Sequence, residues 1–214
     1  MRKSKKIKLK GQNAYAFVVD GDTEVWYLQM LKRNERTLSV NIEPKLPSKK
    51  SISEQFEMVE SLAEDYTKVF WIVDYDVIIK ETREAKKGVE TAEQLFIRLR
   101  DAANKIENVV VIVNNPCLEF WFLLHFERTS KLFTACSSSE KQLKKYLTDY
   151  EKTKQYFTKQ GSDIYLKLKG HISQAIDNSS KLNSFDKYRT SQAFCEMNLF
   201  FNLSEIKNTV CGKK

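Results

Sequence analysis

Two apolar runs that end in acidic residues decide the fold of this chain: Ala14-Tyr15-Ala16-Phe17-Val18-Val19-Asp20 and Val69-Phe70-Trp71-Ile72-Val73-Asp74. Short continuous runs of this kind, rich in β-branched and aromatic residues, are typical of strands that are buried on both faces. Each run delivers carboxylates into the loop that follows it, which is where open α/β sheets form their ligand crevices. The two runs together predict a divalent-metal site at the carboxyl edge of a sheet.

Strand-like and helix-like runs alternate along the first two thirds of the chain. We expect strands at 15–19, 38–42, 68–73 and 109–113, and helices at 23–33, 53–64 and 92–105. Asp22 or Thr23 is expected to cap the first helix, and residues 43–47 are expected to form the loop that leaves the second strand. This order implies right-handed crossovers, and therefore a mostly parallel, Rossmann-like sheet with helices on both faces.

The last third of the chain changes character. Helical patterns at 140–150 and 163–178 are rich in Lys and Tyr, and strand signals are weak there. We therefore expect an α/β core over residues 1–136, which begins with a basic arm, and a helical extension over residues 137–214. The sequence assigns no role to residues 188–214.

Composition narrows the class of protein. The chain has 214 residues, a net charge of +8 and a pI near 9.2, which favours a polyanionic partner, nucleic acid first. Its four cysteines show no CxxC spacing, so we expect neither a disulfide framework nor a zinc site, and a reducing, cytoplasmic setting. No signal peptide or membrane span is evident, and self-association into a homo-oligomer is left open.

The N-terminus carries six Lys or Arg among its first ten residues. Such a segment can form a phosphate-binding arm, or it can be a solvated terminus that frays. The sequence favours neither alternative.

Carboxylates at the two strand ends suggest the chemistry. Asp74 and Asp76 lie two residues apart, so in extended backbone both side chains emerge on the same side and can reach one cation. Asp20 and Glu24 flank the Gly21 turn and supply further oxygen ligands. Such hard ligands, without Cys or His, favour Mg²⁺ or Mn²⁺. Acids are common in turns and near helix N-termini, and only the combination of the two clusters makes the pattern specific.

A third motif starts at the end of the fourth expected strand, in residues 114–126. Asn115 can cap a helix and Pro116 suits the first helical position, so a helix is expected to start at the same edge of the sheet. Glu119 would then lie in the first turn of an apolar helix, either as a catalytic residue aimed into the crevice or as an acid favoured by the helix dipole. His125, among aromatic residues, is expected to be a buried core residue.

Four cations follow the second acidic cluster, namely Lys80, Arg83, Lys86 and Lys87. They are candidates for gripping a nucleic-acid backbone or for neutralising a phosphate in the transition state. The alternative is a solvated loop.

These motifs resemble a known family. The pattern of strand, acid, Gly and Glu, followed by strand and Asp-x-Asp, resembles the TOPRIM core of topoisomerases, bacterial primases and overcoming-lysogenization-defect nucleases. The match is closer to the RloB-like proteins, which include the smaller component of the AbiL abortive-infection system. The run Asn114-Asn115-Pro116-Cys117-Leu118-Glu119-Phe120-Trp121-Phe122-Leu123-Leu124-His125-Phe126 is similar to their NPxFExWxLLHF signature, and residues 175–178 are similar to their C-terminal helix. The resemblance covers roughly residues 10–180.

The chain departs from that family at one position and matches it poorly near its end. The family usually carries Glu where this chain has Asp20, and a metal-ligand role survives the loss of one methylene more easily than a general-base role does. Residues 188–203 have little similarity to the family.

The resemblance implies a metal-dependent nuclease that cleaves RNA, with tRNA as one candidate, or DNA, in anti-phage abortive-infection defence. It also implies an ATPase partner that holds cleavage in check. The candidate catalytic residues are Asp20, Glu24, Asp74, Asp76 and Glu119, and the first four are the candidate ligands of Mg²⁺ or Mn²⁺. The alternative is a non-catalytic module that binds nucleic acid or a partner and uses the acids for a structural metal.

Overall fold

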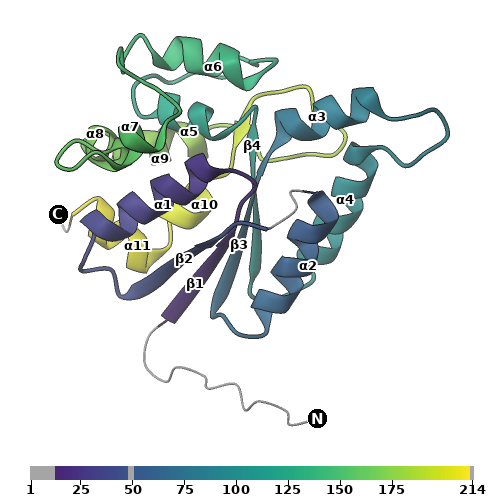
Figure 1. Ribbon diagram of the computed structural model, residues 1–214, viewed down its shortest axis with the longest axis horizontal. Helices are drawn as coiled ribbons and strands as arrows, with labels where there is room; N and C mark the ends of the chain where they lie inside the picture. The colour runs from purple at the N-terminus through teal and green to yellow at the C-terminus, as the bar shows by residue number, and fades with distance from the viewer. Residues whose placement is uncertain (1–12, 48–50, 213–214) are drawn as a thin grey trace.

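A five-stranded sheet in the order β2-β1-β3-β4-β5 carries the fold of the computed structural model, which describes residues 13–47 and 51–212 (Figure 1). The strands are β1 (Asn13–Val18), β2 (Val40–Lys45), β3 (Lys68–Asp74), β4 (Val109–Asn115) and β5 (Phe194–Cys195). The first four strands run parallel, and β5 pairs antiparallel with β4. The prediction of a mostly parallel, Rossmann-like sheet is therefore confirmed. The basic arm at residues 1–10 lies outside the described residues.

Helices cover both faces of the sheet (Figure 1). They are α1 (Asp22–Asn34), α2 (Ile52–Ala63), α3 (Tyr75–Glu84), α4 (Ala92–Ala103), α5 (Leu118–Leu124), α6 (Cys136–Leu143), α7 (Lys154–Thr158), α8 (Ile164–Lys169), α9 (Ile172–Ser180), α10 (Asn198–Phe201) and α11 (Ser204–Val210). One apolar cluster joins the sheet to α2, α3 and α4, and a larger one joins it to α1, α5 and the later helices. No described helix is both long enough and apolar enough to cross a membrane.

The central strand β3 shows why the apolar runs are continuous. Phe70 and Ile72 pack into the larger cluster on one face, whereas Val69, Trp71 and Val73 pack into the cluster on the other face. A strand whose two faces are both covered needs apolar side chains at every position. Polar residues occur only at the two ends of β3, where Lys68 begins the strand and Asp74 ends it.

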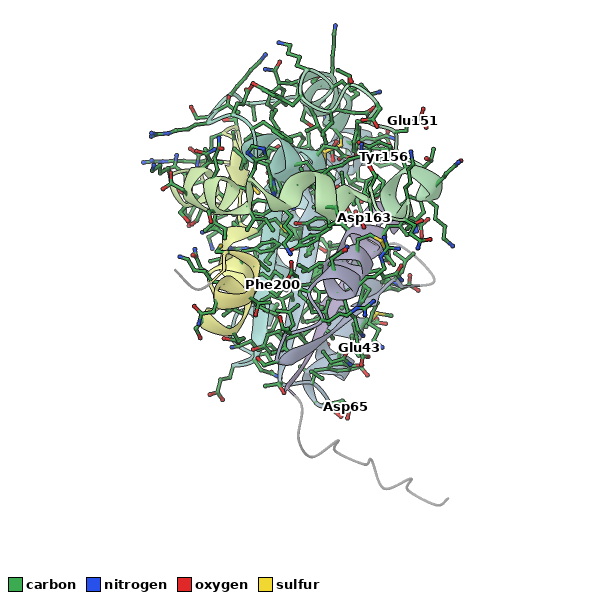
Figure 2. All side chains as sticks on the ribbon, turned by 90° about the vertical axis from the view of Figure 1, so that its left-hand side faces the viewer. Glu43, Asp65, Glu151, Tyr156, Asp163 and Phe200 are labelled. Atoms are coloured by element: carbon green, nitrogen blue, oxygen red, sulfur yellow. A yellow bond between two sulfur atoms is a disulfide. The ribbon has the colours of Figure 1, made fainter. Side chains whose placement is uncertain are left out.

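The last third of the chain packs mainly on the face that α1 and α5 cover. Seen from that side, the later helices lie above and beside α1 (Figure 2). Asp163 ties α8 to α1, because it accepts a hydrogen bond of 2.7 Å from Arg33 and also caps α8 through the Leu166 N–H at 3.0 Å. The described residues from 137 to 212 thus share a core with the sheet and also add its fifth strand.

Several expected boundaries in the last third were wrong. The helix expected at 140–150 ends at Leu143, and the one expected at 163–178 is split into α8 and α9 at Gly170. The segment expected to be helical also contributes strand β5, whose Phe194 and Cys195 pair with the end of β4. A strand of two residues is too short to leave an alternating pattern in the sequence.

Local corrections also fall beside the strand ends. Pro44 lies inside β2 rather than in a loop, which is tolerated because β2 is an edge strand whose outer side needs no N–H donor. The N-cap of α1 is Gly21, so neither Asp22 nor Thr23 caps it. Residues 75–84 form α3 where a loop was expected, and Asp76 therefore lies in a helical turn rather than in extended backbone.

The helix of the third motif begins later than expected. Its N-cap is Cys117, and the peptide bond between Asn115 and Pro116 is cis, so Pro116 is not the first helical residue. The Asn115 side chain does not cap the helix and instead donates to the Gln192 carbonyl at 2.8 Å. This bond fastens the segment before β5 to the end of β4.

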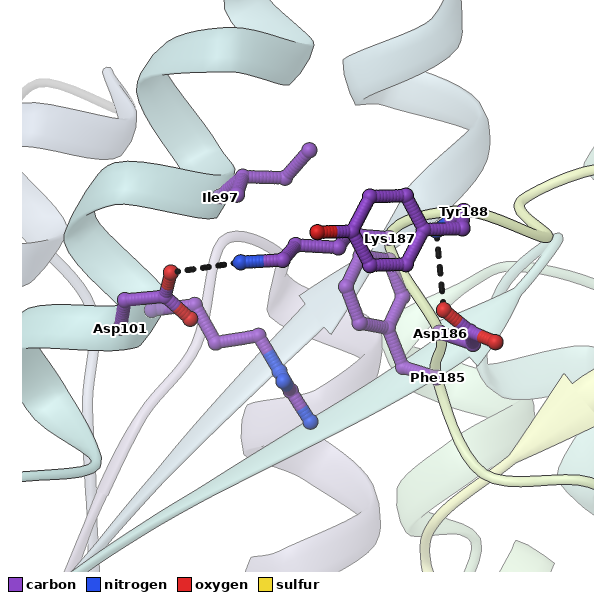
Figure 3. A pocket seen from close by; sticks show the side chains of 7 residues that line it. Ile97, Asp101, Phe185, Asp186, Lys187 and Tyr188 are labelled. Carbon is purple, nitrogen blue, oxygen red and sulfur yellow. Dashed lines mark hydrogen bonds and ion pairs between the residues drawn. The ribbon is translucent and has the colours of Figure 1, made fainter.

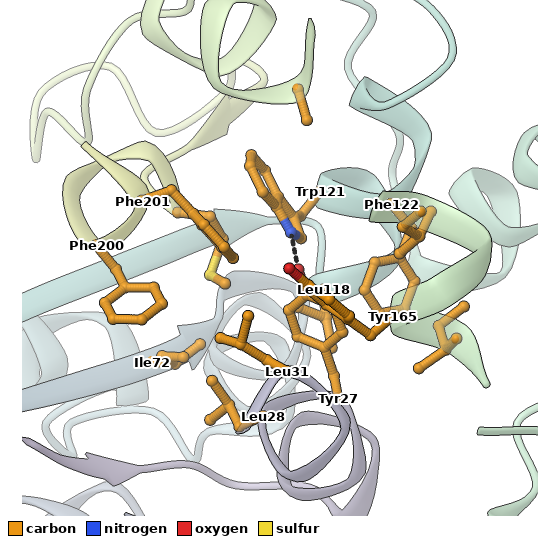
Figure 4. Packing of buried hydrophobic residues seen from close by; sticks show 14 of the residues in the cluster. Tyr27, Leu28, Leu31, Ile72, Leu118, Trp121, Phe122, Tyr165, Phe200 and Phe201 are labelled. Carbon is orange, nitrogen blue, oxygen red and sulfur yellow. Dashed lines mark hydrogen bonds between the residues drawn. The ribbon is translucent and has the colours of Figure 1, made fainter. Parts of the chain in front are cut away.

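A buried hydrogen bond between α1 and α5 provides a test of this packing. Trp121 Nε1 donates to the Tyr27 hydroxyl at 3.0 Å, and both side chains are fully buried (Figure 4). In Tyr27→Phe the indole N–H keeps its burial and loses its acceptor, so we expect the free energy of unfolding in urea to fall by about 1–3 kcal/mol. Tyr188→Phe is the control, because Tyr188 is 85% exposed, and should leave stability unchanged. Equal stability of the two variants would contradict the assigned bond.

Candidate metal centre

Three carboxylates meet where β1 and β3 end. Asp20 follows β1, Glu24 lies in the first turn of α1, and Asp74 is the last residue of β3. One oxygen from each lies within 4.8 Å of the others. Because β1 and β3 are parallel neighbours, their carboxyl ends lie at the same edge of the sheet, as the sequence predicted.

The glycine between the first two acids gives Glu24 its place. A Cβ atom at Gly21 would collide with Glu24 Oε2, so a larger residue would displace that carboxylate. The backbone of Gly21 is extended, so its lack of a side chain matters here and its conformational freedom does not. The Thr23 hydroxyl donates to the same Oε2 atom at 3.0 Å and fixes its orientation.

Burial and mutual repulsion disfavour charge on these acids. Burial, followed by the charge of Asp20, raises the pKa of Glu24 to about 8. Burial and the charges of Glu24 and Asp20 raise the pKa of Asp74 well above its usual range. The cluster therefore needs protons or a cation to be stable at neutral pH.

The donor set fits a hard divalent cation. Asp74 as a residue is only half-buried, but its Oδ1 atom is shielded from solvent and has no hydrogen-bond partner among the described residues. A shielded carboxylate oxygen without a donor is costly unless it ligates a metal or holds a proton. Three carboxylates without His favour Mg²⁺ or Mn²⁺ over softer metals. Asp20, Glu24 and Asp74 could hold such an ion.

Asn114 is a candidate site residue that the sequence did not single out. It is the register partner of Asp74 across the β3–β4 ladder, so both side chains emerge on the same face. Asn114 is fully buried, and neither its side-chain oxygen nor its nitrogen has a hydrogen-bond partner among the described residues. The sequence feature that could have identified Asn114 is an amide side chain at the end of an apolar strand.

Asp76 lies beside the three acids and outside their 4.8 Å group. Its Oδ2 atom accepts a hydrogen bond of 2.9 Å from the Cys136 backbone N–H, and its own N–H donates to the Pro116 carbonyl at 3.1 Å. Burial raises the pKa of Asp76, and the Cys136 N–H and Lys152 oppose that shift. Asp76 therefore joins the starts of α3, α5 and α6.

Glu119 is buried next to these acids and is fully engaged by the protein. Its Oε1 atom accepts from the Tyr150 hydroxyl at 2.7 Å and pairs with Lys152 Nζ at 2.8 Å. Its charge contributes to the raised pKa values of Glu24 and Asp74, which places it in electrostatic reach of both. Glu119 thus links the acidic cluster to a cation.

That cation, Lys152, was not identified as a site residue from the sequence. Burial acts to lower its pKa, but the charges of Glu119 and Asp74 outweigh this effect and raise it. Lys152 precedes α7 in a lysine-rich stretch, where nothing in the spacing distinguishes it from its neighbours. Only the folding of the last third back onto α5 brings it to the acids.

The expectation that the cysteines form no disulfide was wrong. Cys117 and Cys136 are joined by a disulfide, with their Cα atoms 5.6 Å apart and a sequence separation of 19. The pair was invisible in the sequence because it depends on the starts of α5 and α6 lying side by side. Cys195 and Cys211 are free thiols.

The four cations expected to bind nucleic acid do not converge on the acids. Lys80 and Arg83 lie on α3, and Lys86 and Lys87 lie in the turn after it, all exposed. At about 1.5 Å per residue, Arg83 is about 10 Å further along the helix than Asp76. Figure 1 shows α3 leading away from the sheet edge.

His125 is a core residue, as expected. Its Nδ1 atom lies 3.0 Å from the Trp121 carbonyl, and the ring is fully buried. Burial lowers the pKa of His125 to about 3, so the ring stays neutral and takes no part in the acidic cluster.

Two surface pockets differ in charge. One, of 220 Å³, lies between α4 and the segment before β5, and its cations face acids: Lys187 pairs with Asp101 at 3.3 Å (Figure 3). The other, of 410 Å³, lies beside α6, and the described residues that line it include three lysines and no acid. These lysines are Lys131, Lys141 and Lys145. The second pocket has the composition expected for binding a polyanion.

Comparison with known proteins gives one match. A family model described as RloB-like protein matches residues 15–203. Searches among curated proteins and among solved structures each found no match. The matched range contains all five candidate catalytic acids, and it extends over residues 188–203, where inspection of the sequence found little similarity.

The acidic cluster predicts that stability depends on both pH and metal. The folded protein holds a proton on Glu24 up to about pH 8, whereas the unfolded chain releases it near 4.5. Without metal, this contribution to stability is fully present below the lower value and is lost as pH rises through the upper one, by on the order of a few kcal/mol. Urea unfolding in a chelator should therefore show falling stability across this range, and Mn²⁺ should restore it at the alkaline end only.

Glu24→Gln is the matched variant for this experiment. It removes the titrating group and keeps its size, so the fall in stability should become smaller and Mn²⁺ should stabilise less. Stability that does not change with pH in the chelator, and that Mn²⁺ does not raise, would exclude the metal centre.

Proposed function

The chain belongs to the RloB-like family, which is associated with defence systems, and we propose that it is a metal-dependent nuclease of such a system with a TOPRIM-like core. The proposal rests on one observation above all, the oxygens of Asp20, Glu24 and Asp74 within 4.8 Å of one another at the edge of a parallel sheet. Cleavage of a phosphodiester is the chemistry that such a cluster serves with Mg²⁺ or Mn²⁺.

The residues around the three acids would have different roles in cleavage. Bound there, Mg²⁺ or Mn²⁺ would polarise the phosphodiester and lower the pKa of water. Lys152 carries the positive charge that would stabilise the phosphate as its charge develops, and it is held by Glu119, which Tyr150 in turn orients. Asp76, outside the three ligands and with a raised pKa, is the carboxylate best suited to move a proton.

Nucleic acid would approach over α6. The lysine pocket borders α6, the helix whose first residue, Cys136, donates to Asp76: Lys141 lies on α6, Lys131 precedes it and Lys145 follows it. A nucleic-acid backbone held there would lie beside the helix whose first residue contacts Asp76. This pocket therefore replaces α3 and its following turn as the preferred contact surface. Either RNA, with tRNA as one candidate, or DNA fits this chemistry.

The regulation we propose rests on the family resemblance. An ATPase partner would hold the nuclease in check in the cytoplasm, as the RloB-like and AbiL resemblance implies. Purification of the tagged chain from cells that also express a candidate ATPase encoded beside it would test the partnership, and failure of the two to purify together would count against it.

The test of the activity is cleavage by the purified protein. RNA and DNA substrates should be cut with Mg²⁺ or Mn²⁺ and not with a chelator. Asp74→Asn should lower the rate by roughly 100-fold or more, because it removes one ligand charge and leaves the fold intact. Asp177→Asn is the control, since Asp177 is an exposed acid on α9, and should cleave at the normal rate.

Two outcomes would contradict the nuclease. If Asp74→Asn cleaves as fast as Asp177→Asn, any cleavage comes from elsewhere. If the wild type binds metal and cuts no substrate, the acids hold a structural cation and the chain is a binding module.

The lysine pocket makes a separate prediction about binding. With the non-cleaving Asp74→Asn protein as background, Lys141→Ala and Lys145→Ala should weaken binding to a fluorescent single-stranded oligonucleotide. Each removed phosphate contact should lower the slope of log affinity against log salt by about 0.7. Lys80→Ala and Arg83→Ala are matched controls on α3. Larger effects from the α3 pair would move the contact surface back to that helix.

A further inference from the structure

The disulfide between Cys117 and Cys136 lies against a residue of the acidic centre. Glu119 Oε2 is 3.0 Å from Cys117 Sγ and 2.8 Å from Cys136 Sγ. The other oxygen of Glu119 is held by Tyr150 and Lys152. Both cysteine sulfurs therefore form one wall of the Glu119 carboxylate site, and a change in either one changes its surroundings.

Cys136 also has direct contacts with two further residues of the centre. Its backbone N–H donates to Asp76 Oδ2 at 2.9 Å, and its sulfur lies 3.3 Å from Lys152 Nζ. Cys136 is the first residue of α6, and the N-cap before it, Ala135, makes no side-chain capping bond. The covalent bond to Cys117 is therefore a direct restraint that holds this end of α6 against α5, beside the hydrogen bond from the Cys136 N–H to Asp76.

The two sulfurs differ in access. Cys117 is 1% exposed, whereas Cys136 is partly exposed. A reductant can therefore reach the disulfide from the Cys136 side. The contact with Lys152 also places a positive charge next to the sulfur that would be attacked.

We propose that the Cys117–Cys136 pair is a thiol–disulfide exchange site, with a dithiol reductant as its partner, and that its disulfide form is the one that binds metal tightly at Asp20, Glu24 and Asp74. This exchange site rests on the proposed function only in requiring that Asp20, Glu24 and Asp74 bind a metal ion. The first thiolate of the reductant attacks Cys136 Sγ and forms a mixed disulfide, while Cys117 leaves and takes up a proton. The second thiol of the reductant then displaces Cys136, so that two thiols form on the chain and the reductant becomes a disulfide.

Reduction would act on the centre through α6. Once the covalent bond is open, the first turn of α6 is no longer fixed, and Asp76 can lose the Cys136 N–H. Lys152 and Glu119 lose the wall that keeps them paired beside Asp74. Disturbing groups that orient metal ligands typically weakens metal binding by about 10-fold or more. Reduction should therefore lower metal affinity without removing any ligand.

The experiment compares the wild-type protein in its two redox forms. One sample is kept oxidised, and the other is reduced with dithiothreitol and desalted without oxygen. Mass spectrometry of alkylated peptides shows the state of each cysteine, and calorimetry measures Mn²⁺ affinity. We expect the reduced form to bind Mn²⁺ about 10-fold more weakly, and reoxidation to restore the affinity.

Cysteine variants separate this pair from the rest of the chain. Cys136→Ser should bind Mn²⁺ as the reduced wild type does, and reductant should not change it. Cys211→Ser is the control, because Cys211 is a free thiol at the C-terminal end of α11 and is far from the Cys117–Cys136 pair in the sequence. The Mn²⁺ affinity of this variant should respond to reductant as that of the wild type does. The wild-type comparison remains decisive if Cys136→Ser does not fold.

Two results would overturn the proposal: equal Mn²⁺ affinity in the two redox forms, or failure of Cys117 and Cys136 to form a disulfide in air. Redox-dependent Mn²⁺ binding without cleavage of any substrate would support the exchange site and exclude the nuclease. Cleavage of a substrate with the same Mn²⁺ affinity in the two redox forms would support the nuclease and exclude the exchange site.

Discussion

The repulsion among Asp20, Glu24 and Asp74 is the constraint on which the surrounding structure depends. Their oxygens lie within 4.8 Å of one another, and burial of Glu24 and of the Asp74 Oδ1 atom reduces the screening of their charges by water. A folded protein keeps such a cluster only if the gain in packing elsewhere exceeds its cost. The continuous apolar strands beneath it supply that packing on both faces of the sheet.

The second half of the chain supplies a positive charge beside the acids that the first half brings together. The centre is built at the ends of β1 and β3, but the cation beside it, Lys152, comes from the segment after α6. Glu119 mediates between them, because one of its oxygens binds Lys152 and its charge reaches Glu24 and Asp74. The later helices therefore do more than cover the sheet, since they bring a positive charge to an edge that is otherwise acidic.

Features that follow from local sequence and from parallel strand geometry were predictable. Asp20, Glu24 and Asp74 were placed together correctly, since acids at the ends of adjacent parallel strands must meet. Asp76 was assigned the wrong backbone, because Asp74 and Asp76 were taken together as one extended strand end, although Tyr75, Ile78 and Ile79 have the i, i+3, i+4 spacing of a helix face. Lys152 and the pairing of Cys117 with Cys136 could not be predicted, because both depend on how α5 and α6 pack.

Asn114 shows how the sheet itself extends the centre. It pairs with Asp74 on β3 and with Cys195 on β5, so the fifth strand covers the last two residues of β4, Asn114 and Asn115, on the side away from β3. Glu196, the residue after β5, accepts the Val113 N–H at 3.0 Å and continues this cover by one residue. With the backbone of β4 satisfied in this way, the Asn114 amide is the polar group left at the end of the strand. A short antiparallel strand from the last third of the chain thus ends the sheet beside the acids, and this strand lies inside the residues that the family model matches.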